Sequence, residues 1–344
     1  MKILHAVRSD GFAGVERHVA RLAAAQAAAG HEVVVVGGDP ARMRAALQDR
    51  VPALPAVTVL DVATQIRRAS RGMDVVHTHM TAAEVGAALA AWRGGRRALT
   101  VPLVTTRHFA RPRGTGAFGR ATAAVARSGV RAQIAISTYV AENIDGTSVV
   151  VHPGVDSRPD ATPARSRERS VLVVQRLEAE KATDVALRAF AASGLARSGW
   201  RLDVAGDGAQ RPRLEALAQE LGTAAAVHFL GARDDVEALM GRSAILVAPC
   251  PGEGLGLSVL EAMACGLPVV ATASGGHLET VGAIDPGVMF APGDATTAGA
   301  VLAALAVDRR RRDKLARAGQ LSQRTGFTLD AQVASTEAIY RSVL

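Results

Sequence analysis

The chain is poor in cysteine, with only Cys250 and Cys265 among its 344 residues. Two thiols cannot build a disulfide framework or a cysteine-rich metal cluster, so we expect both to be small residues in a reduced interior. Aromatic residues are only 3% of the chain, and no recognised nucleic-acid module occurs, so we expect no nucleic acid partner. The apolar runs are too short to span a bilayer as a helix.

The chain also does not begin like a secreted protein. Lys2 is followed at once by the strand-like residues 3–7 rather than by a long apolar region with a cleavage site, which favours a cytoplasmic location. With 49% apolar and 21% charged residues, the composition is that of a globular protein. A length of 344 residues allows two domains, each with its own core.

Lysine is nearly absent, and almost all basic residues are arginine. The basic residues are unevenly distributed along the chain. Residues 1–155 hold 19 Lys and Arg against 10 Asp and Glu, a net charge of +9, whereas residues 156–344 hold 21 against 22, a net charge of −1. Codon bias explains much arginine but not its segregation. We therefore expect the first half to meet an anionic or lipid-linked acceptor, with peripheral contact at the inner face of a membrane.

Strand-like and helix-like segments alternate along the chain, which predicts parallel sheets covered by helices. A polar stretch with two prolines, residues 156–170, interrupts the pattern and is predicted to be a linker. Ligands of two such domains are expected in the cleft between them, off the carboxyl ends of the strands. The expected strands are 3–7, 32–36, 57–60, 74–77, 103–106, 132–136 and 149–151, then 171–174, 201–205, 227–230, 245–248 and 269–271.

The most informative segment is residues 249–272, in which Glu253 and Glu261 flank a glycine-rich turn that enters a helix. Gly254 and Gly256 let the backbone approach a ligand, and amides at the helix start suit a diphosphate. The carboxylates suit sugar and ribose hydroxyls. A structural alternative remains open: Ser258 and Glu261 have the spacing of a capping box, S-x-x-E.

Position by position, this segment resembles the E-x7-E element of retaining glycosyltransferases of family 4. The resemblance implies the GT-B fold, an α/β architecture of two doubly wound Rossmann-like domains facing a cleft. It divides the chain into an acceptor-binding domain at 1–155, the linker at 156–170, a donor-binding domain at 171–326, and a C-terminal helix at 327–344 that crosses back to the first domain.

A second stretch, 174–181, resembles the V-G-R-L…E-K-G element of the same family, whose Arg and Lys hold the donor pyrophosphate. Here they are Arg176 and Lys181, and positive charge is what a leaving diphosphate requires. The chain departs from the pattern at Gln175 and Ala182, where the family has glycine.

The first half carries weaker family elements. The loop 11–14 with Glu16 and His18 resembles the segment over donor phosphate and acceptor, although Glu16 alone also suits a helix start. The segment that ends at His108 resembles a strand-end segment of the family whose histidine hydrogen-bonds the donor sugar. His77 and His79 match a family pattern, and each also fits a satisfied core histidine. The predicted acceptor-binding residues are Glu16, His18, His79, Arg107 and Arg111.

The remaining donor contacts lie in two loops of the second half. Gly206 resembles the family turn near the nucleotide, and Arg233 the loop that meets the base. The predicted catalytic residues are His108, Glu253, Arg176 and Lys181. The predicted donor-binding residues are Gly14, Arg176, Lys181, Gly206, Arg233, Glu253, Gly254, Leu255, Gly256, Leu257, Ser258 and Glu261.

No D-x-D motif occurs, which together with Arg176 and Lys181 predicts a site with no metal and no other cofactor. The predicted function is transfer of a sugar from a nucleotide diphosphate sugar, UDP rather than GDP by family frequency, with retention of configuration. Two alternatives stay open. One is a nucleotide-sugar epimerase or sugar phosphorylase on the same fold, and the other is a non-catalytic basic module that binds membranes or polyanions.

Overall fold

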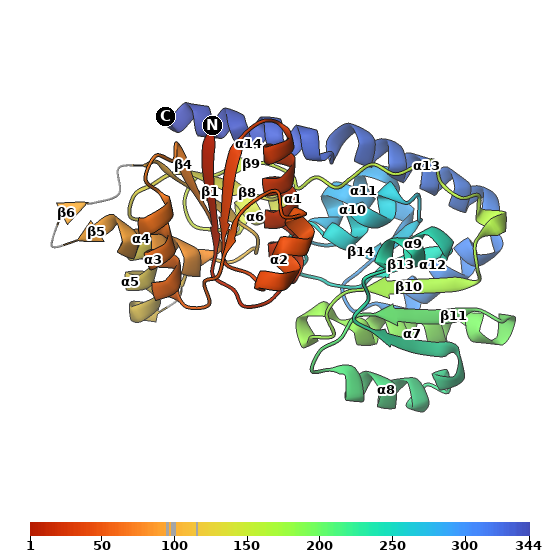
Figure 1. The fold of residues 1–344 in the computed structure, drawn as a ribbon. Coiled ribbons are helices and arrows are strands. Elements are labelled where there is room, and N and C mark those ends of the chain that lie inside the picture. The colour runs from red at the N-terminus through yellow and green to blue at the C-terminus, as the bar shows by residue number, and fades with distance from the viewer. Residues whose placement is uncertain (94–95, 98–100, 115) are drawn as a thin grey trace. The chain divides into compact units, whose positions relative to one another are not determined.

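The structure, a computed structural model, describes residues 1–93, 96–97, 101–114 and 116–344. These residues form two compact units (Figure 1). The first unit comprises Met1–Gly154 together with Leu329–Leu344, and the second comprises Val155–Thr328. The C-terminal helix therefore belongs to the same unit as the N-terminal strand. No helix within the described ranges is long and apolar enough to cross a membrane.

The first unit is built on a parallel sheet of seven strands in the order β3-β2-β1-β4-β7-β8-β9. A separate antiparallel pair consists of β5 (Trp92–Arg93) and β6 (Arg96–Arg97). The sheet strands are β1 (Lys2–Val7), β2 (Glu32–Val36), β3 (Ala53–Leu54), β4 (Val75–His79), β7 (Leu103–Arg107), β8 (Val130–Ala135) and β9 (Val149–Val150). The helices are α1 (Gly14–Ala28), α2 (Pro40–Leu47), α3 (Val59–Ala69), α4 (Thr81–Ala91), α5 (Gly116–Arg127), α6 (Thr138–Glu142) and α14 (Leu329–Val343).

Alternate residues of β1 enter two different hydrophobic clusters, as the two-residue period of a strand requires. Ile3 and Val7 join a cluster with side chains of α1 and α14, in which Tyr340 is fully buried. Leu4 and Ala6 join a second cluster with side chains of α3 and α4. The sheet is thus covered on both faces, and His5 lies on the face of α1 and α14.

The second unit contains a parallel sheet of six strands in the order β12-β11-β10-β13-β14-β15. Its strands are β10 (Ser170–Val174), β11 (Arg201–Ala205), β12 (Val227–Gly231), β13 (Ile245–Ala248), β14 (Val269–Thr272) and β15 (Met289–Phe290). Its α-helices are α7 (Thr183–Ser193), α8 (Arg211–Glu220), α9 (Val236–Arg242), α10 (Leu257–Ala264), α11 (His277–Ile284), α12 (Ala295–Val307) and α13 (Arg309–Gly326).

Each sheet reverses its strand order at one point. In the first unit β1 lies between β2 and β4, and in the second unit β10 lies between β11 and β13. Chain connections leave in opposite directions on either side of such a strand, which opens a crevice at its carboxyl end where ligands bind. The residues after β1, β4, β10 and β13 are therefore the first places to look for function.

One predicted strand, 57–60, is wrong. Thr58 is instead the N-cap of α3, because its hydroxyl accepts a hydrogen bond from the N–H of Asp61 at 3.1 Å while Asp61 accepts from the N–H of Thr58 at 2.8 Å. This reciprocal capping box starts a helix where the apolar residues Val57, Val59 and Leu60 suggested a strand.

Residues 156–170, which are predicted to be a linker, lie within the second unit. Arg167 is 8% exposed, and its guanidinium donates to the carbonyl oxygens of Met240 and Ser243 at the end of α9. It also donates to the carbonyl oxygens of Cys265 and Gly266 after α10. One arginine thus satisfies the carbonyl ends of two helices, which fixes this segment against the fold.

Candidate active site

The glycine-rich turn of the second unit connects β13 to α10 and is held by close backbone contacts. The N–H of Gly276 donates to the carbonyl oxygen of Glu253 at 2.9 Å, which ties the turn to the loop after β14. A Cβ on Gly276 would lie 2.4 Å from the carbonyl oxygen of Gly254, so only glycine permits this approach. Gly256 has a φ of +93° directly before α10. Glu253 and the start of α10 therefore lie at the carboxyl edge of the sheet.

The start of α10 resolves the capping alternative for Glu261. The helix begins at Leu257 with Gly256 as its N-cap, so Ser258 already lies inside the helix. A capping box would require Ser258 at the N-cap. No side chain of the described residues caps α10, and its first N–H groups suit an anion.

Lys181 and Glu253 form an ion pair with 2.7 Å between Nζ and Oε2, and their side chains are 18% and 24% exposed. Burial alone would raise the pKa of Glu253, but the charge and hydrogen bond of Lys181 outweigh it and leave that pKa below its ordinary value. Burial likewise opposes the charge of Lys181, and Glu253 raises the pKa of Lys181 above its ordinary value. Both groups are charged at neutral pH, so the carboxylate of Glu253 only accepts hydrogen bonds.

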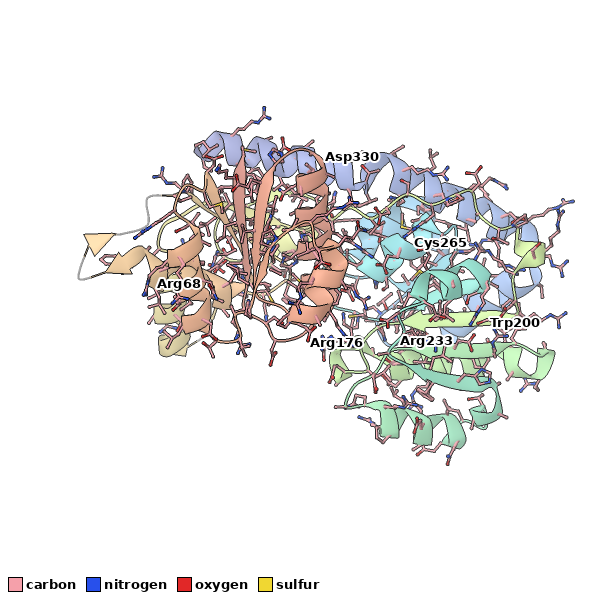
Figure 2. The ribbon with its side chains drawn as sticks, viewed as in Figure 1. Arg68, Arg176, Trp200, Arg233, Cys265 and Asp330 are labelled. Carbon is pink, nitrogen blue, oxygen red and sulfur yellow. The ribbon has the colours of Figure 1, made fainter. Side chains whose placement is uncertain are left out.

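The turn after β10 places Gln175 and Arg176 at the same edge. Arg176 is exposed (Figure 2), and its Nη2 lies 3.0 Å from a carboxylate oxygen of Glu180. The amide of Gln175 donates to the carbonyl oxygen of Lys181 at 2.9 Å and to the hydroxyl of Thr183 at 2.8 Å. Between those two partners stands Ala182, with the left-handed φ of +50°. Gln175 thus forms hydrogen bonds with the residues on both sides of Ala182, whose backbone is strained.

Two further predicted donor residues lie on neighbouring loops of this sheet. A Cβ on Gly206, which follows β11, would lie 1.8 Å from the carbonyl oxygen of Gln175, so this turn also requires glycine. Arg233, after β12, is exposed (Figure 2), and its Nε is 2.7 Å from Asp235. The second unit therefore brings Arg176, Lys181, Gly206 and Glu253 to one edge.

His277 is a candidate site residue that the sequence did not reveal. It begins α11, is 1% exposed, and its Nε2 would lie 3.4 Å from a Cβ at Gly256. Its Nδ1 is a buried polar atom without a hydrogen-bond partner among the described residues. The available signal was its place directly after the loop that ends in Gly276.

Both cysteines are structural rather than reactive. Cys250 is buried and Cys265 is partly exposed, and neither is in a disulfide. Burial raises the pKa of each thiol to about 11. Because the thiolate is the reactive form, both side chains are inert near neutral pH.

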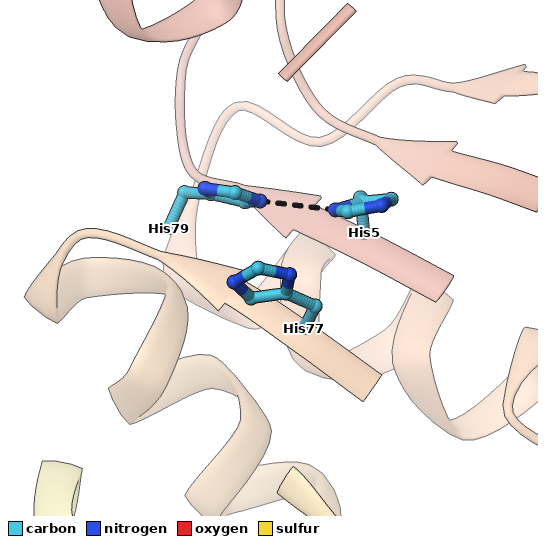
Figure 3. Close-up of side chains that lie close together, drawn as sticks. All are labelled: His5, His77 and His79. Carbon is cyan, nitrogen blue, oxygen red and sulfur yellow. Dashed lines mark hydrogen bonds between the residues drawn. The ribbon is translucent and has the colours of Figure 1, made fainter. Parts of the chain in front are cut away.

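In the first unit, buried histidines gather around the switch-point strands. His5 and His77 are register partners on β1 and β4, and His79 is two residues further on the same face. Figure 3 shows these three rings, with a hydrogen bond of 3.0 Å between Nδ1 of His5 and Nε2 of His79. His108, just after β7, joins through its Nε2, which is 3.1 Å from Nδ1 of His79. The ring of His18 meets that of His108 edge-on, with centroids 4.8 Å apart.

These five histidines are uncharged at neutral pH. Burial lowers the pKa of His5 to about 4, and burial with the nearby charge of Arg107 lowers that of His108 to about 3. Burial is also the main reason why the pKa values of His18, His77 and His79 lie well below the ordinary 6.5. A neutral imidazole has one donor and one acceptor nitrogen, so the position of each proton matters.

Glu16 and Gly14 lie at the start of α1. The carboxylate of Glu16 is buried and accepts a hydrogen bond from the N–H of Ala13 at 2.8 Å, which satisfies a free amide at the helix start. Gly14 is exposed, and a Cβ there would meet nothing within 4 Å.

The two arginines predicted to bind the acceptor, Arg107 and Arg111, differ in exposure. The side chains of Arg107 and Arg113 are 5% and 2% exposed, and they pair with Asp145 at 3.1 and 2.7 Å. Arg113 also pairs with the fully buried Glu84 at 2.6 Å. The guanidinium groups of Arg107 and Arg113 thus already have carboxylate partners inside the fold. Of the predicted acceptor arginines, Arg111 remains exposed.

Comparisons with known proteins show the family and the fold. Residues 12–158 match a family model described as Glycosyltransferase Family 4, and residues 156–322 match one described as Glycosyl transferases group 1. A glycogen synthase of Mycobacterium tuberculosis is 30% identical over 385 aligned residues, which cover 95% of this chain and 90% of that protein.

A D-inositol 3-phosphate glycosyltransferase of M. tuberculosis is 44% identical over 144 aligned residues, but these cover only 37% of this chain and 29% of that protein. Among solved structures, Anabaena HepE in complex with UDP-glucose superposes with a TM-score of 0.82 at 21% identity, covering 99% of this chain and all of that one. The two Rossmann-like units are those of the GT-B fold, and the chain belongs to glycosyltransferase family 4.

Proposed function

We propose that this protein transfers a sugar from a UDP-sugar to an acceptor hydroxyl with retention of configuration, without a divalent metal on the diphosphate. The observation that carries the proposal is the charged Lys181–Glu253 pair beside the uncapped start of α10. That arrangement offers cationic donors, helix amides and a fixed carboxylate to one ligand. The solved complex of the similar HepE with UDP-glucose supports UDP as the nucleotide.

Each residue has a distinct part in this proposal. Arg176 and Lys181 stabilise the charge that develops on the leaving diphosphate. The amides of Leu257 and Ser258 bind the same phosphates, and Glu261 binds the ribose diol. Glu253, oriented by Lys181, positions the sugar.

The test is sugar transfer from UDP-glucose and related donors in excess EDTA, with wild type, Arg176→Ala and the control Arg213→Ala on α8. We expect activity in EDTA and a loss of roughly 100-fold in kcat for Arg176→Ala only, the scale of one preorganised electrostatic contact. Activity that EDTA abolishes and Mg²⁺ restores would contradict the metal-free site.

Two further measurements, donor consumption without acceptor and binding to vesicles, separate the alternatives. Consumption of the donor without any acceptor would indicate an epimerase or phosphorylase. Salt-sensitive binding to anionic vesicles, with no nucleotide binding, would indicate a binding module.

We propose further that the acceptor is anionic. Arg111 and Arg120 are exposed, and Arg111 lies 5.5 Å from the ring centre of the half-exposed Phe109. Exposed charges are screened within about 8 Å at physiological salt, so high salt should weaken acceptor affinity more than donor affinity. Arg111→Ser with Arg120→Ser should remove that difference, whereas Arg42→Ser with Arg44→Ser on α2 should not. Equal salt dependence for both substrates would overturn the proposal.

A further inference from the structure

The buried histidines of the first unit form part of one hydrogen-bonded chain, and the direction of each bond in it can be assigned. The chain runs from His108 through His79 and His5 to Gln26 of α1, where Nε2 of His5 is 2.7 Å from Oε1 of Gln26. From Gln26 it continues through Nε2 to the hydroxyl of Tyr340 at 3.4 Å.

The second half of this hydrogen-bonded chain fixes the direction of its hydrogen bonds. The hydroxyl of Tyr340 is 2.6 Å from Nδ1 of His77, whose Nε2 is 2.7 Å from the hydroxyl of Thr106. A phenol is a better proton donor than a neutral imidazole, and an imidazole nitrogen is a better acceptor than a phenol oxygen, so Tyr340 donates to His77. The phenol oxygen then accepts from the amide nitrogen of Gln26, which turns the amide oxygen toward His5.

The orientation of Gln26 then determines which ring nitrogen of His5, His79 and His108 carries the proton. His5 donates from Nε2 to Gln26, so its Nδ1 accepts from Nε2 of His79. The Nδ1 of His79 in turn accepts from Nε2 of His108. The proton of His108 is therefore on Nε2, and its Nδ1 carries a lone pair. His108 is 7% exposed, and its Nδ1 makes no hydrogen bond with any described residue.

His18 has the opposite tautomer for an independent reason. Oε1 of Gln332 accepts from the N–H of Gly154 at 2.8 Å, and a backbone N–H can only donate. The amide nitrogen of Gln332 therefore faces Nε2 of His18, at 3.3 Å. This leaves the proton of His18 on Nδ1, and the residue is 4% exposed.

His5, His77 and His79 do not have the geometry of a metal site. His77 stacks on His79, with centroids 4.4 Å apart and planes at 28° (Figure 3). Rings that meet face to face do not direct lone pairs at one ion about 2.0–2.1 Å from each nitrogen. Both ring nitrogens of His5, His77 and His79 are also in hydrogen bonds.

We propose that Gln26 and Gln332 are positioning residues that set opposite tautomers on His108 and His18, so that the two rings together bind one substrate hydroxyl. The hydroxyl donates to Nδ1 of His108 and accepts from Nδ1–H of His18. Such a pair discriminates against a deoxy or etherified group, because each lost hydrogen bond leaves a polar nitrogen unpaired. The tautomers stand on the hydrogen bonds alone, whereas the hydroxyl as ligand rests on the proposed function.

The test is ¹⁵N NMR of histidine-labelled, ligand-free protein, in which the shifts of the two ring nitrogens report which one carries the proton. We expect Nε2–H at His5, His77, His79 and His108, and Nδ1–H at His18. We also expect ¹⁵N–¹⁵N couplings across the His5–His79 and His79–His108 hydrogen bonds. A proton on Nδ1 of His108 or on Nε2 of His18 would overturn the assignment without any variant.

Two reciprocal variants test the glutamines. Gln26→Leu should give Nδ1–H signal at His108 and leave His18 unchanged, and Gln332→Leu should do the reverse. Each variant should lower kcat/KM about tenfold, which corresponds to the loss of one hydrogen bond. The affinity for UDP without sugar should stay the same. If each variant changes the tautomers of His108 and His18 to the same extent, the two glutamines have a merely structural role.

The substrate arm is a titration with UDP-glucose. It should shift Nδ1 of both His108 and His18, and UDP alone should not. Shifts confined to other histidines would remove the hydroxyl from the proposal. Correct tautomers in a protein that transfers no sugar would instead refute the proposed function and leave the tautomer assignment standing.

Discussion

Backbone strain at Ala182 is the clearest feature at the scale of single residues. This alanine has φ +50° and ψ +40°, a left-handed conformation that costs a residue with a Cβ about 1–2 kcal/mol. Gln175 holds the residues on both sides of it. The two positions at which the chain departs from the family's glycines are therefore linked: the side chain gained at Gln175 supports the strain introduced at Ala182.

We predict that Ala182→Gly raises the free energy of unfolding by about 1 kcal/mol, because relief of strain exceeds the entropy that glycine adds to the unfolded chain. Gln175→Ala should destabilise wild type by about 1–2 kcal/mol and should cost less in the Ala182→Gly background. Urea unfolding of the four proteins measures this coupling. Strict additivity of the two changes would show that the residues act separately.

At the scale of elements, Arg167 shows how a single side chain organises a segment. It donates to four carbonyl oxygens at the ends of α9 and α10, at 2.8–3.0 Å. Burial lowers its pKa from the ordinary value, yet the guanidinium remains charged, so these bonds are charge-assisted.

Arg167→Ala should therefore lower the free energy of unfolding by about 3 kcal/mol, since hydrogen bonds to a charged group are each worth about 1.5–3 kcal/mol and the lost ones are partly replaced by water. Arg165→Ala, two residues away and exposed, is the matched control and should change stability by less than about 0.5 kcal/mol. A similar small effect for both would show that the segment is held by other contacts.

The buried histidines predict a pH dependence for the first unit. Their folded pKa values lie below the unfolded value of 6.5, so their contribution to stability is present above pH 6.5 and is lost as pH falls. A histidine that stays neutral in the folded state lowers the free energy of unfolding by about 1.4 kcal/mol for each pH unit below 6.5, and the effects of the five act in the same direction. Hydrogen exchange corrected for intrinsic rates should show β1 and β4 losing protection before β10 and β11. Parallel loss in both units would contradict this.

What the sequence could predict depends on the distance over which a signal acts. The strands Glu32–Val36, Arg201–Ala205 and Ile245–Ala248 match their predicted ranges, because apolar residues predominate in each, as is typical of strands buried in a parallel sheet. The residues 57–60 also form an apolar run, and there the capping pair of Thr58 and Asp61 decided in favour of a helix.

Long-range partners could not be predicted. Burial of Arg107 and Arg113 depends on Glu84 and Asp145, and the histidine chain depends on Gln26 and Tyr340, which lie 314 residues apart. No local pattern marks any of these residues. The site in the second unit was easier to predict, because two glycine-rich turns and a charged pair follow neighbouring strands.

At the scale of the whole molecule, the central claim is that the second unit binds a nucleoside diphosphate through the start of α10 and Glu261. The most direct measurement is calorimetric titration of UDP, GDP and ADP in excess EDTA into wild type, Glu261→Gln and the control Arg165→Ala. We predict that UDP binds wild type and the control equally and binds Glu261→Gln at least tenfold more weakly, the cost of a charged hydrogen bond. Absence of binding by all three nucleotides, or equal UDP affinity in all three proteins, would contradict the account.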